Sequence, residues 1–295
     1  MTEVKREISR GVKPARRTIF HDLIDPAPLV DEDFAVKARE PLSDVAVFAD
    51  AVNVTGAGAE TTGSTAGRAI FEVLHNPEVH RKLHQELCDA FPDPAGINLL
   101  ALEKLPYLGG VIKEALRHVA VPGVQARYRT KLTLGRLNPG LPGHLPRVVP
   151  PSGAVFDGLA LPPGTVVSMS AWLMHHDAAA FRPDPAAFDP DRWTNPTESK
   201  EKADQIRARD KCMVPFGKGS RNCLGQTLAM CELHYTIESI FRLYEPGTLA
   251  IHPDFGREDL ELTELLLGYH PRKARKFRIV KGVPVGEVVR EIQGA

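Results

Sequence analysis

The chain has 295 residues, with 37 basic and 37 acidic side chains that leave no formal net charge. This balance gives no electrostatic reason to expect nucleic acid or an anionic membrane surface as a partner. A hydrophobic fraction of 43% with 25% charged residues excludes a disordered chain. No run approaches the roughly 18 apolar residues of a membrane-spanning helix. Four cysteines without a CxxC pair argue against a disulfide framework or a structural zinc site.

The hydrophobic pattern predicts a mainly α-helical chain with a small β-sheet. A loop is expected over residues 20–40, and the charged run 198–211 is either a surface helix or a loop. The expected helices cover residues 4–9, 42–75, 77–90, 104–119 and 223–243. The expected strands of a small hairpin sheet cover residues 147–149, 154–156 and 165–167.

The long helix 42–75 has an unusual middle that contains Gly58 and Gly63. Each glycine costs about 1 kcal/mol relative to alanine in a helix interior, so we expect a distorted turn or the close approach of something flat. Glu60 and Thr61 lie in the same stretch, and a carboxylate beside a hydroxyl can relay protons in a closed site. The alternative is an ordinary threonine pair that caps or bonds back to the helix.

A second candidate site lies in residues 215–225, where a Gly-rich loop enters a helix. The partial positive charge of a helix N-terminus favours a thiolate at Cys223. Gly217 and Gly225 let the backbone approach a ligand of the sulfur, and Arg221 can pair with an anionic group of that ligand. The alternative is a buried structural cysteine, but the spaced features around Cys223 favour a thiolate that binds a ligand.

A third constellation is the pair Glu114 and Arg117, which shares one helix face at a spacing of three residues. The two side chains can form a charge-assisted hydrogen bond, and residues 188–193 offer a third partner. The alternative is a solvated surface pair worth a few tenths of a kcal/mol.

Together these segments resemble the cytochrome P450 family of haem-thiolate monooxygenases. The family's haem loop Phe-x-x-Gly-x-Arg-x-Cys-x-Gly matches residues 216–225, and its Glu-x-x-Arg helix matches residues 114–117. Its following loop matches residues 188–192, and its long-helix signature matches residues 57–62. The resemblance covers nearly the whole chain and implies the C-terminal part of that fold. Within the family the chain is similar to fungal microsomal members that act on terpenoids or other secondary metabolites.

The resemblance implies a role for each matched residue. Cys223 is the implied axial ligand of the haem iron, and Glu60 with Thr61 is implied to deliver protons during dioxygen activation. The other implied cofactor-binding residues are Arg221 and Arg147, which match positions that bind the haem propionates, together with Phe216, Gly217 and Gly225. The implied structural triad, which locks the core beside the haem loop, is Glu114, Arg117 and Arg192.

Two features depart from the family pattern. The chain begins just before the long helix, so we expect a single haem-binding domain, residues 1–295, that lacks the N-terminal half of the fold and its membrane anchor. Residues 124–143 lie between two Pro-Gly pairs and carry basic but no acidic side chains. We interpret residues 124–143 as an extra insertion, and as an in-frame retained intron.

The resemblance implies hydroxylation or epoxidation of a small apolar substrate. The implied cofactor is haem b, with electrons from NADPH through NADPH-cytochrome P450 reductase. An intact member is implied to lie on the cytosolic face of the endoplasmic reticulum membrane, and this chain, without an anchor, in the cytosol. One alternative is an inactive or poorly folding fragment of such an enzyme. Another is a haem-thiolate isomerase or dehydratase, which the intact pair Glu60 and Thr61 disfavours.

Overall fold

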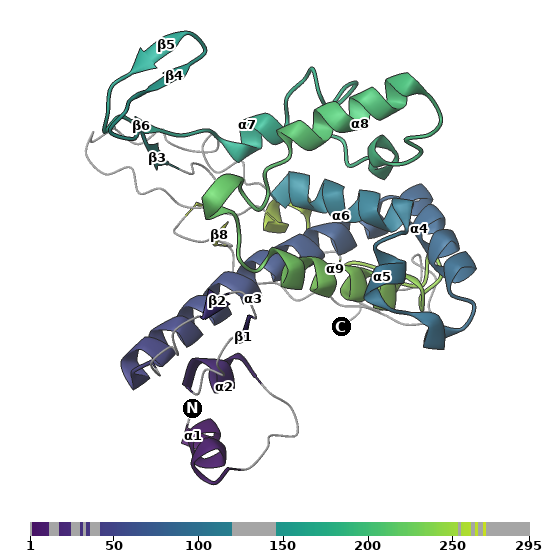
Figure 1. The fold of residues 1–295 in the computed structure, drawn as a ribbon. Helices are drawn as coiled ribbons and strands as arrows, with labels where there is room; N and C mark the ends of the chain where they lie inside the picture. Colours follow the sequence, from purple (N-terminus) through teal and green to yellow (C-terminus); the bar gives the residue numbers. More distant parts are fainter. Residues whose placement is uncertain are drawn as a thin grey trace. The chain divides into compact units, whose positions relative to one another are not determined.

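The computed structural model describes residues 2–11, 18–24, 30–31, 34–35, 42–119, 146–252, 255–260, 263–264 and 268–269 (Figure 1). The chain divides into two compact units, residues 1–59 and residues 60–295. The segment 124–143, interpreted above as an insertion, lies outside the described residues.

Helices make up most of the described structure, as the sequence predicts. They are α1 (Thr2–Ser9), α2 (Ile19–Ile24), α3 (Asp44–His75), α4 (Pro77–Ala90), α5 (Leu99–Leu102), α6 (Pro106–Val119), α7 (Ala171–His175), α8 (Lys200–Cys212) and α9 (Gln226–Phe241). The helices α1, α3, α4, α6 and α9 confirm the five expected helices, with ends that differ by a few residues. The charged run 198–211 forms a helix, α8, rather than a loop.

The short helix α2 corrects part of the loop expected over residues 20–40. Thr18 precedes this helix, and its backbone N–H donates to His21 Nδ1 at 3.1 Å. The Thr18 hydroxyl lies 2.8 Å from the same nitrogen. Both contacts join Thr18 to the His21 ring, so a side chain three residues into the turn satisfies a backbone N–H at the helix start, which the apolar pattern alone does not reveal.

The long helix α3 runs without interruption from Asp44 to His75, so the distortion expected around Gly58 is wrong for this structure. A Cβ atom built at Gly58 or Gly63 would meet no described atom within 4 Å. The helical backbone hydrogen bonds therefore continue through the glycines despite their propensity cost. Within the described ranges, no helix combines the length and the apolar character needed to cross a membrane.

The expected strands occur, but not in one sheet. β3 (Arg147–Val148) pairs with β6 (Val166–Val167), whereas β4 (Ala154–Phe156) forms a separate hairpin with β5 (Leu159–Leu161). Asp157 and Gly158 connect the hairpin at φ angles of +49° and +77°, the left-handed pair that a tight hairpin turn requires. The other described strand pairs are β1 (Val30–Asp31) with β2 (Phe34–Ala35) and β7 (Thr263–Glu264) with β8 (Gly268–Tyr269).

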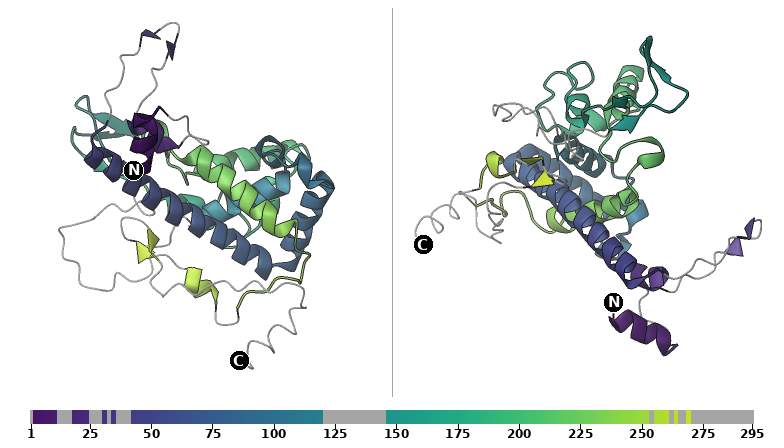
Figure 2. Two further views of the ribbon diagram at one scale, coloured as in Figure 1. Left: turned by 90° about the horizontal axis from the view of Figure 1, so that it is seen from below. Right: turned by 90° about the vertical axis from the view of Figure 1, so that its left-hand side faces the viewer.

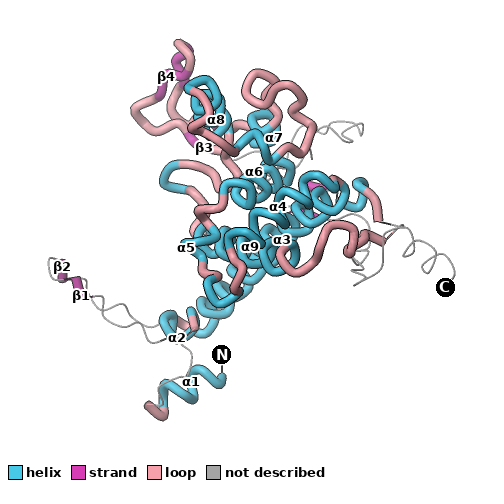
Figure 3. The backbone as a smooth tube through the Cα atoms, turned by 90° about the vertical axis from the view of Figure 1, so that its right-hand side faces the viewer, coloured by secondary structure: helices cyan, strands magenta, loops and turns pink. Residues whose placement is uncertain are grey.

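The main core lies among α4, α6, α9 and residues 60–75 of α3, which gather in one bundle (Figures 2 and 3). Each helix contributes an apolar stripe at the spacing of an amphipathic helix. In α6 the stripe is Leu108, Val111, Ile112 and Ala115, and in α9 it is Leu233, Ile237 and Phe241. These residues are almost completely buried, so their burial supplies most of the apolar driving force for this unit.

The C-terminal end of α9 is held by side chains of α4. His80 Nε2 lies 3.2 Å from the Tyr244 carbonyl, and His84 Nδ1 lies 2.8 Å from the Phe241 carbonyl. Carbonyls at a helix C-terminus lack partners within the helix, and imidazole N–H groups satisfy them here. These contacts fix one end of the helix that follows Cys223.

The helix α6 packs very closely on the 3-10 turn Pro190–Trp193. A Cβ atom at Gly110 would lie 2.6 Å from the Pro190 carbonyl oxygen, whereas one at the adjacent Gly109 would meet nothing within 4 Å. Glycine at position 110 is therefore required by close backbone approach and not by its conformational freedom.

We predict opposite effects for alanine at these two neighbouring positions. Gly110→Ala should lower the free energy of unfolding by about 1–3 kcal/mol, because the added methyl group overlaps a backbone oxygen. Gly109→Ala should raise it by up to about 1 kcal/mol through helix propensity. Denaturant unfolding of both variants measures the difference. Equal changes in the two variants would show that α6 does not approach Pro190 this closely.

Candidate functional site

The loop that carries Cys223 is closed by a backbone hydrogen bond. The Cys223 N–H donates to the Phe216 carbonyl at 2.7 Å. Between them, Gly217 and Gly219 have φ angles of +72° and +78°, which favour glycine at both positions. A Cβ atom at Gly225 would lie 4.0 Å from the Cys223 sulfur. The sequence motif thus folds into a tight turn that presents the thiol.

The thiol of Cys223 is exposed and lies just before the N-terminus of α9. Gly225 caps this helix without a side-chain hydrogen bond, so no capping side chain takes up the first N–H groups at the positive end of the helix dipole. Leu224, the next residue along the chain, and Leu228, in the first turn of α9, are also exposed. A thiolate ligand next to an uncovered apolar surface fits a large, flat, mainly apolar group that contains a thiol-binding metal. The residues present therefore fit haem.

The two arginines expected at the propionates lie on the surface. Arg221 ends the 3-10 turn Gly219–Arg221, two residues before Cys223. Arg147 lies on β3, and its guanidinium donates to the carbonyl of Pro146 at 3.0 Å. Both side chains are exposed. Among the described contacts, none joins either guanidinium to Cys223, so their role at a cofactor stays a prediction.

Glu60 and Thr61 lie on one turn of α3, and both residues are exposed. The buried hydroxyl of Thr65 donates to the Thr61 carbonyl at 2.9 Å. Thr65 thus bonds back to the helix one turn after Thr61, and the alternative that the threonine pair itself caps or bonds back to the helix stays open. The role of Glu60 and Thr61 in proton delivery stays a prediction.

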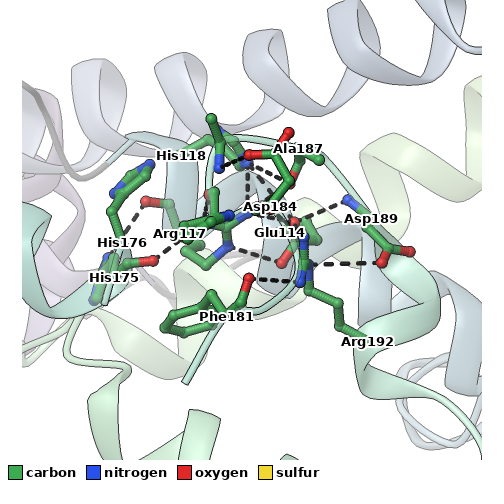
Figure 4. Close-up of polar contacts among 12 residues, drawn as sticks. Glu114, Arg117, His118, His175, His176, Phe181, Asp184, Ala187, Asp189 and Arg192 are labelled. Carbon is green, nitrogen blue, oxygen red and sulfur yellow. Dashed lines mark hydrogen bonds and ion pairs between the residues drawn. The ribbon is translucent and has the colours of Figure 1, made fainter. Parts of the chain in front are cut away.

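The Glu114–Arg117 pair is buried, not solvated. Both side chains are 0% exposed, and the guanidinium donates to both carboxylate oxygens, at 2.9 and 2.7 Å (Figure 4). The Trp193 indole N–H and the Asp189 backbone N–H each donate to the same carboxylate at 2.9 Å. Arg192 completes the predicted group at longer range, with its Nε 4.0 Å from Glu114. The structure thus brings the three predicted residues together.

Both arginines also bind the backbone of residues 176–189, which we call the 176–189 loop. Arg117 donates to the carbonyls of Pro185 and Ala187 in this loop, and to that of His175, the last residue of α7. Arg192 donates to the carbonyls of Phe181, Arg182 and Asp184. These contacts satisfy carbonyl groups that no helix or strand pairs within this loop.

Burial acts on the titration of this network in two directions. Burial alone raises the pKa of Glu114, but the His118 ring 3.7 Å away and the hydrogen bonds from Arg117 and the Asp189 N–H outweigh it and lower the pKa to about 2. Burial lowers the pKa of His175 to about 4. The His175 ring accepts from Val214 N–H at Nε2, 2.8 Å away, and its Nδ1 lies 3.4 Å from the Arg117 carbonyl. This arrangement requires a neutral imidazole.

Several residues of the network are absent from the sequence-based site. Trp193 follows Arg192 directly, and His118 lies four residues after Glu114, so adjacency and helical spacing could have suggested them. Arg209, which binds the Arg192 carbonyl at 2.7 Å, gives no such signal because it is distant in sequence and lies in a charged run.

We predict that Glu114→Ala lowers the free energy of unfolding by about 3–5 kcal/mol, because it leaves buried guanidinium groups without their carboxylate. Glu78→Ala is the matched control, since Glu78 forms the same i,i+3 pair with Arg81 on the exposed face of α4. The control should leave the unfolding midpoint nearly unchanged. A small effect at position 114 would mean that the pair is accessible to water.

Because His175 is neutral in the folded chain, we expect the free energy of unfolding to fall on acidification at pH values above those at which carboxylates titrate. An unfolded histidine binds a proton below about 6.5, whereas His175 resists protonation until about 4. Stability should therefore fall by up to about 3 kcal/mol as pH is lowered from about 6.5 to about 4. The Glu114 contribution is lost in a lower range, as pH falls from about 4 towards 2.

His175→Gln should flatten this pH dependence, because a glutamine oxygen can accept from Val214 N–H without titrating. Some slope should remain from His176, whose pKa burial also lowers to about 4. Urea unfolding at several pH values measures the slope. An unchanged slope in His175→Gln would contradict this assignment.

Comparison with known proteins gives a consistent family. The family model described as cytochrome P450 matches residues 1–135 and 133–250, two stretches that meet inside 124–143. Cytochrome P450 monooxygenase MO6277 of Ascocoryne sarcoides is 36% identical over 247 residues, 83% of this chain and 41% of the relative. Cytochrome P450 monooxygenase tpcC of Cochliobolus heterostrophus is 32% identical over 279 residues, 90% of this chain and 45% of the relative.

A third relative carries a specific name. Fusicoccadiene C-8 hydroxylase of Alternaria brassicicola is 31% identical over 253 residues, 84% of this chain and 42% of the relative. The chain thus spans less than half the length of each of these curated relatives. The family match covers most of the chain and includes both the Glu114–Arg117 helix and the Cys223 loop, so the chain belongs to the cytochrome P450 family.

Proposed function

We propose that this chain is the haem-binding domain of a monooxygenase in which Cys223 is the axial ligand of haem b. The observation that carries the proposal is the exposed thiol at the N-terminus of α9, in a loop closed by the bond from Cys223 N–H to Phe216. Membership of a family whose cofactor is haem supports the choice of ligand. In this proposal residues 1–295 form one domain, with 124–143 as an insertion.

Thiolate-ligated haem, when bound, supplies the activation of dioxygen for insertion of one oxygen atom into a substrate. The residues of this chain orient and protect it. The turn at Gly217 and Gly219 fixes the direction of the Cys223 sulfur, and the dipole of α9 stabilises its negative charge. Leu224 is exposed next to Cys223 and would supply apolar surface that keeps water from the bound cofactor. Phe216 would pack near the haem and tune its potential.

The remaining predicted residues would bind the charged groups of the haem or deliver protons. Arg221 and Arg147 bind the anionic side groups of the haem through charge-assisted hydrogen bonds. Glu60 and Thr61 would serve as the carboxyl and hydroxyl that deliver protons during dioxygen activation. All four residues are exposed in the structure.

The names of two relatives support hydroxylation as the reaction, but they do not identify the substrate of this chain. One relative is a fusicoccadiene C-8 hydroxylase. Another, from Fusarium equiseti, is a tryptophan 6-hydroxylase, 37% identical over 208 residues, 70% of this chain and 35% of the relative. We propose hydroxylation of a small apolar substrate such as a terpenoid. Electrons come from NADPH through NADPH-cytochrome P450 reductase at the cytosolic face of the endoplasmic reticulum.

Cysteine variants test the ligand. The haem-loaded chain in its ferrous, carbon monoxide-bound form should show a Soret band characteristic of thiolate ligation, and Cys223→Ser should remove this band. Cys212→Ser and Cys231→Ser should retain it. Cys212 is a matched control, because it is partly buried and burial raises the pKa of its thiol. A band that survives in Cys223→Ser, or that is lost in a control, would refute Cys223 as the ligand.

A further inference from the structure

A buried arginine outside the predicted triad lies in the last turn of α8. Arg209 is 6% exposed. Its Nε donates to the Ala180 carbonyl at 3.1 Å, and its Nη1 donates to the Arg192 carbonyl at 2.7 Å. Burial and the nearby charge of Arg192 lower the pKa of Arg209. A cation held in this way needs its hydrogen bonds, because each unsatisfied buried group is costly.

The two carbonyls belong to residues that directly precede a pair of buried aromatic rings. Phe181 follows Ala180, and Trp193 follows Arg192. The ring centroids of Phe181 and Trp193 are 6.1 Å apart with an interplanar angle of 57°, and Met213 completes a buried cluster with them. The Arg209 guanidinium thus fixes the spacing of the two backbone segments between which Met213 is held.

Met213 is also the first residue after α8 and the start of the loop that leads to Cys223. Its N–H donates to the Arg209 carbonyl at 3.0 Å, which closes the last turn of the helix. The next residue, Val214, donates its N–H to His175 Nε2, and the Val214 carbonyl accepts from Gly217 N–H at 3.0 Å. Arg209 therefore holds the backbone of Met213 through its own carbonyl, and it positions the two rings that pack with the Met213 side chain.

We propose that Arg209 is a positioning residue for the Cys223 loop. By joining two segments of irregular backbone, it builds the aromatic site that anchors Met213 and so fixes where the ligand loop leaves α8. The relevance of this anchor to the cofactor rests on the proposed function of Cys223, whereas the anchor itself depends only on contacts within the chain.

Hydrogen–deuterium exchange of the haem-free 295-residue chain tests the anchor. Arg209→Met removes the donors and retains an unbranched apolar side chain that extends about as far as the arginine Nε. Arg207→Met is the matched control, because Arg207 lies on the same helix, is exposed, and pairs only locally with Asp204. In Arg209→Met, amides in residues 213–223 should exchange about tenfold faster than in the unmodified chain. Amides in α4 should change little, and Arg207→Met should resemble the unmodified chain.

Arg209→Lys provides a second variant if Arg209→Met does not fold. Lysine keeps the charge, but its single ammonium cannot copy the fork that reaches both carbonyls. We expect faster exchange at 213–223 in this variant too, by a smaller factor. Unchanged exchange in residues 213–223 would overturn the proposal. An equal increase of exchange in α4 would also overturn it, because it would indicate a general loss of stability.

Haem binding gives a readout that separates this proposal from the proposed function. If the unmodified chain shows the thiolate band, Arg209→Met should reduce the thiolate-ligated fraction at least severalfold and Arg207→Met should not. An unchanged fraction would overturn the link between Arg209 and the ligand. Absence of the band in the unmodified chain would refute Cys223 as the ligand, and the exchange measurement would still decide whether Arg209 anchors the loop.

Discussion

The structure around the candidate site depends on the hydrogen bonding of buried backbone that forms no regular element. The 176–189 loop contains no helix or strand, so its inward-facing carbonyls need donors from other parts of the chain. Guanidinium groups are suited to this task because each carries five N–H donors in a planar fork. Arg117 comes from α6, Arg192 from the following turn and Arg209 from α8, and together they bind carbonyls along this loop.

The arginines bring positive charge into the interior, and the Glu114 carboxylate offsets part of it. The Glu114 carboxylate is fully buried and accepts hydrogen bonds from Arg117, from Trp193 and from the backbone of Asp189. Its low pKa of about 2 keeps it ionised at any pH at which the chain would be used. The second carboxylate near Arg192 is Asp189, 3.7 Å away and partly exposed. Glu114 is thus the central acceptor to which α6, the 3-10 turn and the loop are joined.

The Cys223 loop lies between two fixed ends. On one side, Met213 and Val214 are held by the aromatic cluster and by His175. On the other side, α9 packs in the main core, and α4 binds the carbonyls at its C-terminal end. Between these ends, residues 218–225 of the loop and the first three residues of α9 are exposed. Its residues therefore contribute to presenting the thiol and the surrounding apolar surface, while the stability of the region comes from the residues on either side.

The sequence by itself determined the elements and the chemistry of the motifs. Apolar periodicity predicts α3, α4, α6 and α9, because each helix must bury one face. The spacing within 216–225 and 114–117 predicts the tight turn and the ion pair, because both are local geometry. Local spacing could not show whether the Glu114–Arg117 pair is buried or solvated, because the surrounding groups come from residues 175–193. It also gave no indication of Arg209, whose partners Ala180 and Arg192 lie 29 and 17 residues away. Tertiary structure alone decided these points, since burial and long-range hydrogen bonding depend on which segments pack together and not on the residues that neighbour each other in the chain.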